Sequence, residues 1–516
     1  MKPIKLLSGF VTVGFWTLAS RILGFVREIL IAAYIGPGPV LDAFVAAFRL
    51  PNLFRRFFAE GAFNAAFVPQ FADRIEADED AEGFAQQAFN LLAAAVLALT
   101  GLGMVFMPAL VWATAEGFVG DARFDLAVGY GHIVFPYILF MSLAALFSGV
   151  LNATGRFAAA AAAPVLLNIF ACSAMITGAA LGHGVITWLV WTIPVAGVAQ
   201  LALVWRATER AGIRLRPGLP RITPAMGRLV RVAVPAALAM GVTQVNLVVG
   251  QLVASDIENA VSWLFIADRL YQLPLGVVGI AVGIVLLPDL TRRLRAGDDT
   301  GAREGLSRAG EFSLLLTLPS AAAFIAVPVP LVSVLYERGA TGPEDVAAIA
   351  LAVAIYGAGL PAFVLQKVLQ PLYFARQDTR TPFYYALVAM ILNAVLAIGL
   401  KPLVGWVSPA IAASTAGWAM VALLWMGAGR RMGDVARFDA RFFRRGWRIL
   451  AVSLLMGAVL HIGTLQLAWL FYLPSWRYLA LLGLILTGAV IYFGVGQAVG
   501  AFRLAEFKKA LRRNRG

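Results

Sequence analysis

Seven basic residues interrupt long apolar runs of this sequence, where a charged side chain is energetically unfavourable. They are Arg21, Arg27, Arg49, Arg55, Arg56, Arg269 and Lys367. Each costs about 2.5–3.5 kcal/mol at the centre of a membrane helix, so the set would cost roughly 20 kcal/mol if it faced lipid. Packing offers no compensation of that size. We therefore expect these side chains to line water or to bind anions.

Four acidic residues lie in the same runs and could neutralise part of this charge: Glu28, Asp42, Glu60 and Asp268. Fixed pairs with them would still leave an excess of three positive charges, which points to an anionic ligand. Snorkelling to the membrane surface is the alternative, and it is easiest for Arg56, near a helix end. It is harder for Arg21, Arg27 and Arg269, which lie in the middle of their runs.

The spacing of residues 21–28 favours a shared cavity. Arg21 and Glu28 are seven residues apart, so they lie on one helical face with Gly24 between them. Arg27 could flank the same cleft. A glycine at position 24 lets a neighbouring helix come close.

An acidic residue follows the first apolar run at a break in the chain. Residues 36–39 read Gly-Pro-Gly-Pro, which ends a helix, and Asp42 comes just after them. An acid at the outer surface could close a gate by pairing with a cation.

Apolar runs of membrane-spanning length must position these residues. Of the 516 residues, 60% are hydrophobic and 14% are charged, against roughly 25% charged in soluble proteins. The first run is too long and too charged for a cleavable signal peptide. We predict an all-α polytopic membrane protein with about fourteen transmembrane helices. The runs fall at 9–35, 42–70, 86–113, 130–151, 158–182, 185–205, 230–254, 260–290, 311–336, 346–372, 383–400, 403–428, 449–470 and 478–501.

The loops between the runs separate the remaining basic residues by side. With the N-terminus inside, 31 Lys and Arg residues fall on the inner side and four on the outer side, as cytoplasmic loops require. Both termini are then cytoplasmic. The net charge of +14 is explained by anionic lipid at the inner surface rather than by nucleic acid. The tail 502–513 is expected to lie on that surface as an amphipathic helix.

The two halves of the sequence resemble each other. Pro136 precedes Asn168 by 32 residues, and Pro361 precedes Asn393 by the same distance. The offset between the halves, 219 to 225 residues, equals six spans. An even number of spans gives both halves the same orientation, which is a parallel repeat about an axis normal to the membrane.

The repeat predicts two six-helix lobes and two further helices. The tetrapeptides at 47–50 and 267–270, which contain Arg49 and Arg269, match with the same offset. A lipid-binding groove is one possible role for the additional helices. The predicted parts are an N-terminal lobe 1–222, a C-terminal lobe 223–435, and 436–516 with the last two spans and the basic tail.

The spacing of the three histidines predicts no metal site, and a single cysteine cannot form a disulfide within the chain. His132, His183 and His461 lie far apart and match no metal-ligand spacing. Cys172 is the only cysteine. We predict no metal and no cofactor.

Four motifs are distributed along nearly the whole chain. They are Ser-Arg-Ile-Leu-Gly-Phe-Val-Arg-Glu at 20–28, the segment 50–63, Ala-Asp-Arg-Leu at 267–270, and Arg-Gln-Asp-Thr-Arg-Thr-Pro at 376–382. These motifs resemble those of the MurJ (MviN) lipid II flippases. The resemblance implies a fourteen-helix fold of the multidrug/oligosaccharidyl-lipid/polysaccharide exporter superfamily.

The resemblance also implies a substrate and roles for single residues. The substrate would be lipid II, undecaprenyl diphosphate carrying a disaccharide-pentapeptide, with its diphosphate held by Arg21, Arg27 and Arg269, together with Arg55. Asp42 would be required for function, and the last two spans would form a groove for the lipid tail. Gln272 stands where some members have an acid. The positions that we expect to form the gate or support the cavity are Ser20, Glu28, Asp42, Arg49, Asn52, Arg56, Glu60, Asp268 and Lys367.

The mechanism we expect is alternating access in the bacterial inner membrane. Lipid II enters from the inner leaflet, its headgroup crosses in the cavity, and the lobes rock to open the outer side. The membrane potential favours outward movement of an anion by about 2.3 kcal/mol per charge per 100 mV. None of the six lysines follows a glycine, so no P-loop for ATP is present; a coupling ion stays unassigned. The expected partners are lipid II, membrane lipids and the septal cell-wall machinery, with no nucleic acid, and the chain is expected to be a monomer.

Three other functions compete with this interpretation. The scaffold could export drugs or another polyprenyl-linked oligosaccharide, although a cationic-drug exporter should favour acids in its cavity. A membrane enzyme would need a nucleophile and base in register, and the sequence shows no convincing set. A non-transporting scaffold for cell-wall assembly would not need seven intramembrane cations.

Overall fold

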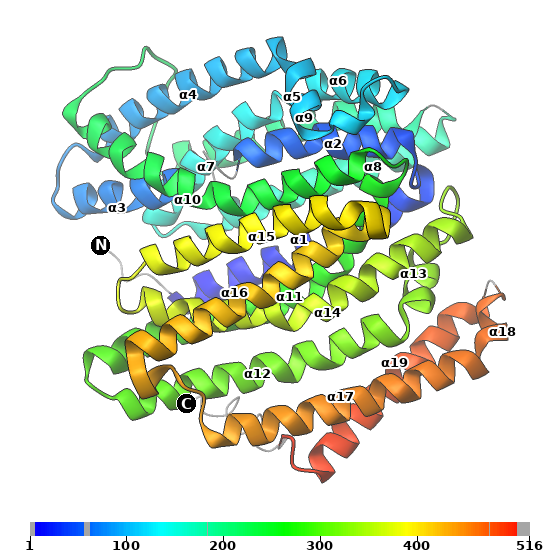
Figure 1. The fold of residues 1–516 in the computed structure, drawn as a ribbon. Helices are drawn as coiled ribbons and strands as arrows, with labels where there is room; N and C mark the ends of the chain where they lie inside the picture. The colour runs from blue at the N-terminus through cyan, green and yellow to red at the C-terminus, as the bar shows by residue number, and fades with distance from the viewer. Residues whose placement is uncertain (1–5, 56–61, 183, 474, 503–516) are drawn as a thin grey trace. The chain divides into compact units, whose positions relative to one another are not determined.

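Every regular element in the described part of the chain is a helix (Figure 1). The computed structural model describes residues 6–55, 62–182, 184–473 and 475–502. Residues 503–513 of the predicted amphipathic tail 502–513, together with Arg56 and Glu60, lie outside these residues. The chain folds as two compact units, one of residues 1–262 with 338–341 and the other of 263–337 with 342–516.

The first unit contains α1 to α10 and the beginning of α11. In it, α8 packs against both α1 and α9, α2 packs against α6, and α10 packs against α3. Its elements are α1 (Leu6–Tyr34), α2 (Pro39–Arg55), α3 (Ala62–Glu76), α4 (Ala81–Val105), α5 (Met107–Thr114), η2 (Glu116–Phe118), α6 (Ala122–Val134), α7 (Tyr137–Ala153), α8 (Phe157–Ala180), α9 (Val185–Arg210) and α10 (Pro224–Ser255).

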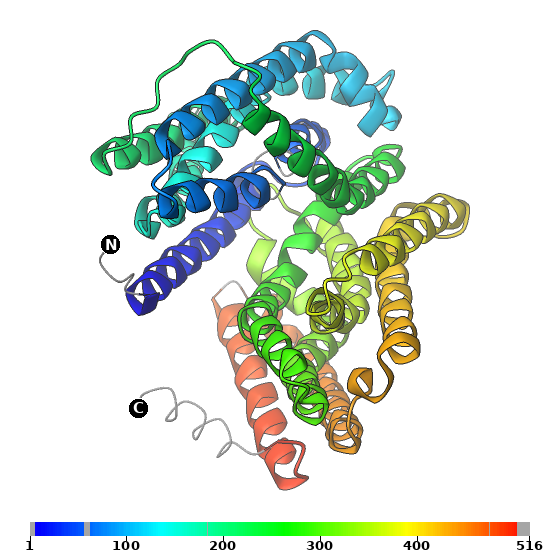
Figure 2. The same ribbon diagram turned by 90° about the vertical axis from the view of Figure 1, so that its left-hand side faces the viewer.

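The second unit contains most of α11 and all later helices. Here α12 packs against α14 and α17, α16 packs against α14 and α15, and α17 and α19 lie side by side (Figure 2). Its elements are α11 (Ala260–Arg295), α12 (Asp299–Ala326), α13 (Pro328–Tyr336), α14 (Pro343–Phe374), α15 (Arg380–Val404), η3 (Gly405–Val407), α16 (Ser408–Met432), η4 (Gly433–Ala436), α17 (Ala440–Gln466), α18 (Ala468–Phe471) and α19 (Trp476–Ala498).

In the part of the chain that the structure describes, each predicted apolar run coincides with one helix or with two consecutive helices, so the all-helical polytopic prediction is confirmed. Within the described residues, nine helical stretches are long and apolar enough to cross a membrane, with α15 and α16 counted as one stretch. The runs 9–35, 42–70, 230–254 and 260–290 are not among the nine. Three of these four hold six of the seven intramembrane cations. The count of fourteen therefore stays a prediction.

Glycine and proline break the helices at residues 36–39, as predicted, and at Pro136, where no break was predicted. The segment 36–39 separates α1 from α2. Gly36 has φ +69°, and a Cβ there would lie 2.5 Å from the carbonyl oxygen of Ala340, so a residue with a side chain would be both strained and blocked. Pro136 separates α6 from α7 within one apolar span of 32 residues.

The features of the sequence repeat occupy matching places in the fold. Pro136 and Pro361 each lie within an apolar span of 32 residues, Ala122–Ala153 and Pro343–Phe374. Asn168 and Asn393 are both buried in the next helix, α8 and α15. The compact units divide after Ser262, inside α11, which does not test the predicted repeat boundary at residue 222.

Candidate functional site

A cluster of polar side chains lies where α1 packs against α8. Arg27 Nη2 is 2.6 Å from Glu28 Oε1, and Arg27 Nη1 donates to Asn168 Oδ1 at 2.9 Å. Asn168 in turn donates to the carbonyl oxygen of Ser20 at 3.0 Å. Glu28 and Asn168 are buried, and Arg27 is half-buried. A guanidinium carries five N–H donors. The two acceptors therefore orient Arg27 and leave further N–H donors for other partners.

The packing of α1 on α8 confirms part of the predicted geometry. A Cβ added to Gly24 would lie 3.6 Å from the side chain of Asn168, so position 24 does face the neighbouring helix. Arg21 is exposed. Glu28 neutralises Arg27 locally, as the fixed-pair alternative proposed, so Arg27 does not contribute to a charge excess by itself.

Helix α2 carries three further predicted residues. Arg49 Nη1 donates to the carbonyl oxygen of Leu247 in α10 at 2.9 Å, which connects the two helices. Asn52 Nδ2 donates to the carbonyl oxygen of Phe48 in its own helix at 2.8 Å. Arg55 is half-buried at the last described residue of α2.

The carboxylate of Asp42, at the first turn of α2, is completely buried, with 0% of the residue exposed. Oδ1 accepts from the backbone N–H and the hydroxyl of Ser262 at 2.8 and 2.5 Å. Oδ2 accepts from the backbone N–H of Asn259 at 2.9 Å and from Arg123 Nη1 at 3.4 Å. We call these residues, with Asp121, the Asp42 network. It joins α2, α6 and the α10–α11 junction.

Arg123 is the cation that pairs with Asp42. The sequence predicted such a pair for Asp42 but did not identify the cation. Only 4% of the residue is exposed, and its Nε is 2.6 Å from Asp121 Oδ2. The backbone N–H of Arg123 and then its guanidinium lower the pKa of Asp121 below the ordinary value of 3.8. The sequence did offer a signal, because Arg123 is one of only four cations in the predicted outer loops.

The second unit holds the remaining described candidates. The Arg269 guanidinium lies 4.7 Å from the centroid of the Phe265 ring, in a cation–π contact. The Gln272 amide donates to Asp268, one turn earlier on α11. An ionised carboxylate at position 272 could not donate this bond. Lys367 is exposed on α14. The cavity that Arg269 was predicted to share with Arg27 stays a prediction.

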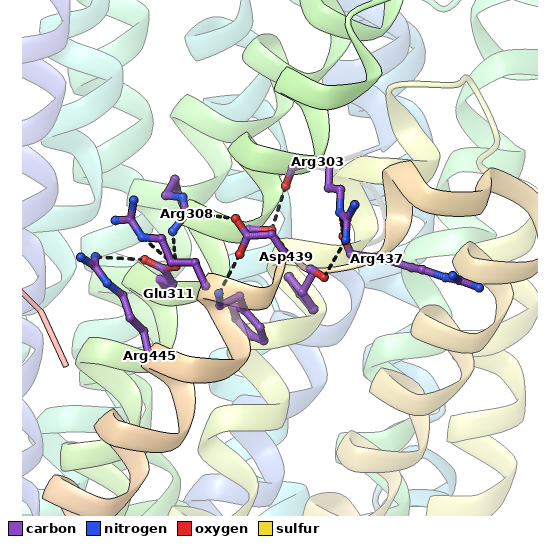
Figure 3. A network of polar contacts seen from close by, with 10 residues as sticks. Arg303, Arg308, Glu311, Arg437, Asp439 and Arg445 are labelled. Atoms are coloured by element: carbon purple, nitrogen blue, oxygen red, sulfur yellow. Dashed lines mark hydrogen bonds and ion pairs between the residues drawn. The ribbon is translucent and has the colours of Figure 1, made fainter. Parts of the chain in front are cut away.

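A second charge network lies between the N-terminal half of α12 and the beginning of α17, and it contains residues that the sequence did not single out (Figure 3). Glu311, 7% exposed, accepts from Arg308 and is 3.5 Å from Arg441 Nε and 3.4 Å from Arg445 Nη1. Arg308 also pairs with Asp439, which caps α17 by accepting from the backbone of that helix. We call these five residues the Glu311 network.

An apolar cavity of about 350 Å³ opens between α12, α13, α17 and α19. Leu315, Leu331, Leu460 and Leu484 are among its lining residues, and the Tyr492 hydroxyl bonds the Leu315 carbonyl oxygen at 2.6 Å. The cavity lies one helical turn beyond Glu311 on α12. Its lining residues are apolar except for Ser320 and Tyr492.

A sequence profile described as "Lipid II flippase MurJ" matches residues 31–486, which is most of the chain. The chain belongs to the MurJ family of lipid II flippases. It is 44% identical to the "Probable lipid II flippase MurJ" of Rhizobium tropici, over 99% of this chain and 98% of that protein. It is 32% identical to the "Lipid II flippase MurJ" of Burkholderia cenocepacia, over 98% and 99%.

Solved structures share the MurJ fold. "Lipid II flippase MurJ, inward closed conformation" superposes with a TM-score of 0.79 at 24% identity, covering 95% of this chain and 98% of that one. An inward-facing multidrug resistance MATE transporter of the MOP superfamily gives 0.66 at 14%, covering 82% and 96%. With its apolar helices, the MurJ-family chain is a multi-pass membrane protein.

Sequence reasoning about this MurJ-family chain missed three residues: Arg123, Asn168 and Glu311. Asn168 had been noted only as a marker of the repeat, and Glu311 was missed because it begins a predicted span beside cytoplasmic arginines. Among the described residues, no group of three or more His, Cys, Asp or Glu side chains could hold a metal ion.

Proposed function

We propose that this protein moves lipid II from the inner to the outer leaflet of the bacterial cytoplasmic membrane for cell-wall synthesis. The observation that carries the proposal is the match to lipid II flippase relatives at 44% identity along 99% of the chain. Charged groups kept within membrane helices agree with it, because a lipid-linked diphosphate is an anionic ligand that must cross the bilayer.

Arg27 illustrates how the diphosphate would be bound. Glu28 and Asn168 hold the guanidinium at 2.6 and 2.9 Å, so little side-chain entropy is lost when it binds a phosphate. Arginine forms bidentate, charge-assisted hydrogen bonds with phosphate oxygens. Arg21, Arg55 and Arg269 would supply further contacts, and the large net positive charge would arise once all of them face one cavity.

The Asp42 network would form the outer gate in an alternating-access cycle. The segment between α10 and α11 supplies two backbone N–H groups to Asp42, so movement of that segment would break the network. Both termini would lie in the cytoplasm, and the membrane potential, rather than ATP, would drive the anion outward. The polyprenyl tail would lie in the cavity between α12, α13, α17 and α19.

Replacement of Arg269 tests the proposal directly. With Arg269→Ala at matched protein level, we expect lipid II exposure at the outer surface to fall at least tenfold, since one charge-assisted contact contributes roughly 1.5–3 kcal/mol. Arg295→Ala on the same helix is the control, because Arg295 is exposed at the end of α11. Normal lipid II exposure in the Arg269→Ala strain would contradict the proposal.

A further inference from the structure

A basic surface cavity lies at the end of α9, away from the residues discussed so far. Its volume is about 360 Å³, and it is lined by Arg206, Glu209, Arg210, Arg214 and Arg216. Four guanidinium groups and one carboxylate give a net charge of three positive units. The Glu209 carboxylate accepts from Trp205 Nε1 at 3.2 Å. The volume falls in the range of small-ligand pockets, ~300–1,000 Å³.

The wall that Arg214 and Arg216 form is held in place by its backbone. The N–H of Arg214 donates to Glu82 Oε1 at 3.0 Å, and the N–H of Arg216 donates to Gln86 Oε1 at 2.8 Å. Leu215 between them is buried, whereas Arg214 and Arg216 are exposed and line the cavity. These bonds fix the backbone positions from which both arginine side chains reach the cavity that they line with Arg210.

The same connection between α9 and α10, visible as the teal-to-green loop in Figures 1 and 2, exposes two large apolar side chains. Leu219 is 85% exposed and Ile222 is 91% exposed. Two exposed aliphatic side chains on the connection that also lines the basic cavity are unfavourable in water, but they suit the boundary between headgroups and acyl chains. Trp205, in the last turns of an apolar span, is a residue type that favours the same boundary.

We propose that this cavity binds the phosphate headgroup of an anionic phospholipid from the adjacent leaflet, of the phosphatidylglycerol class. The arginines would bind the phosphate oxygens through charge-assisted hydrogen bonds, and Leu219 and Ile222 would contact the acyl chains. Basic pockets beside transmembrane helices recognise such headgroups. The site is independent of lipid II transport, so its test does not depend on the proposed function.

Thermal unfolding of the purified full-length protein in neutral detergent measures this binding. Phosphatidylglycerol should raise the Tm, and phosphatidylcholine with the same acyl chains should not. Arg210→Gln with Arg214→Gln should weaken the apparent affinity for phosphatidylglycerol roughly tenfold or more, because two charge-assisted contacts are lost. Arg214→Gln alone, which leaves the backbone bond to Glu82 in place, should give a smaller weakening and guards against misfolding of the double variant.

The matched control, Arg221→Gln with Arg228→Gln, removes one charge from the same connection and one from the first turns of α10, both outside the cavity. Both residues are exposed, and this variant should keep the wild-type affinity. Equal weakening in the control would show diffuse attraction to the surface and overturn the proposal, as would full affinity in the cavity variant. Inorganic pyrophosphate is the third arm, and displacement of phosphatidylglycerol by equimolar pyrophosphate would assign the cavity to a soluble phosphate instead.

Discussion

The Asp42 network and the Glu311 network both centre on a buried carboxylate, but their hydrogen-bond donors differ. Asp42 accepts from two backbone N–H groups and one hydroxyl, with a single arginine at 3.4 Å. Glu311 is surrounded by the long side chains of Arg308, Arg441 and Arg445. Asp42 therefore stabilises one particular backbone conformation, whereas Glu311 pairs with flexible charged side chains.

This difference determines how each network responds to movement. Backbone N–H groups converge on Asp42 only while the α10–α11 junction keeps its present shape, so a small displacement would break several bonds at once. Arginine side chains can follow a helix that slides, because each has several rotatable bonds. The Asp42 network suits a gate with two states, and the Glu311 network suits a permanent connection between α12 and α17.

The largest expected effect comes from Asp42→Asn. Arg123 keeps its Asp121 partner, but an amide offers one acceptor oxygen in place of two. Two buried donors to the position-42 side chain then lose their acceptor, at roughly 1–3 kcal/mol each, so the variant should lose about 3–5 kcal/mol of stability. Thermal or chemical unfolding in detergent measures this loss. Glu116→Gln is the control, since Glu116 is an exposed acid beside the same network. If Asp42→Asn unfolds like wild type, the carboxylate does not hold the junction.

Glu311→Gln should have an intermediate effect, a loss of about 1–3 kcal/mol. Three arginines lose their shared carboxylate, but Arg441 is 42% exposed at its side chain and can turn toward water. Unfolding measurements should be compared with Glu304→Gln, which removes an exposed acid from the same helix. A loss as large as that of Asp42→Asn would remove the distinction between the two networks.

The smallest effect is expected at Asn259, which donates its backbone N–H to Asp42 with φ +67°. Asn259→Ala should cost about 1–2 kcal/mol, because a Cβ disfavours the left-handed region. Asn259→Gly should be nearly neutral for stability, since glycine adopts that conformation without strain. Equal Tm values for the alanine and glycine variants would show that the junction does not depend on this backbone conformation.

Local chemistry made most of the fold predictable. In the described part of the chain the long apolar runs are helical, since a backbone in lipid must satisfy its own hydrogen bonds. The Gly-Pro-Gly-Pro segment ended α1 as expected. The candidate site was less predictable: Arg27 and Glu28 were chosen correctly as neighbours, but Asn168, which orients Arg27, lies 141 residues away, and one sequence carries no signal that pairs them.

The sequence by itself determined the helical, membrane-spanning class, the buried charges that needed partners, and the family. Those properties follow from residue types and short spacings, which act within one helix. Only the tertiary structure decided which partner each charge has: Arg123 with Asp42, Asn168 with Arg27, and three arginines with Glu311. The partner of a charged side chain is set by which faces of distant helices pack together. That packing depends on interactions along the whole chain.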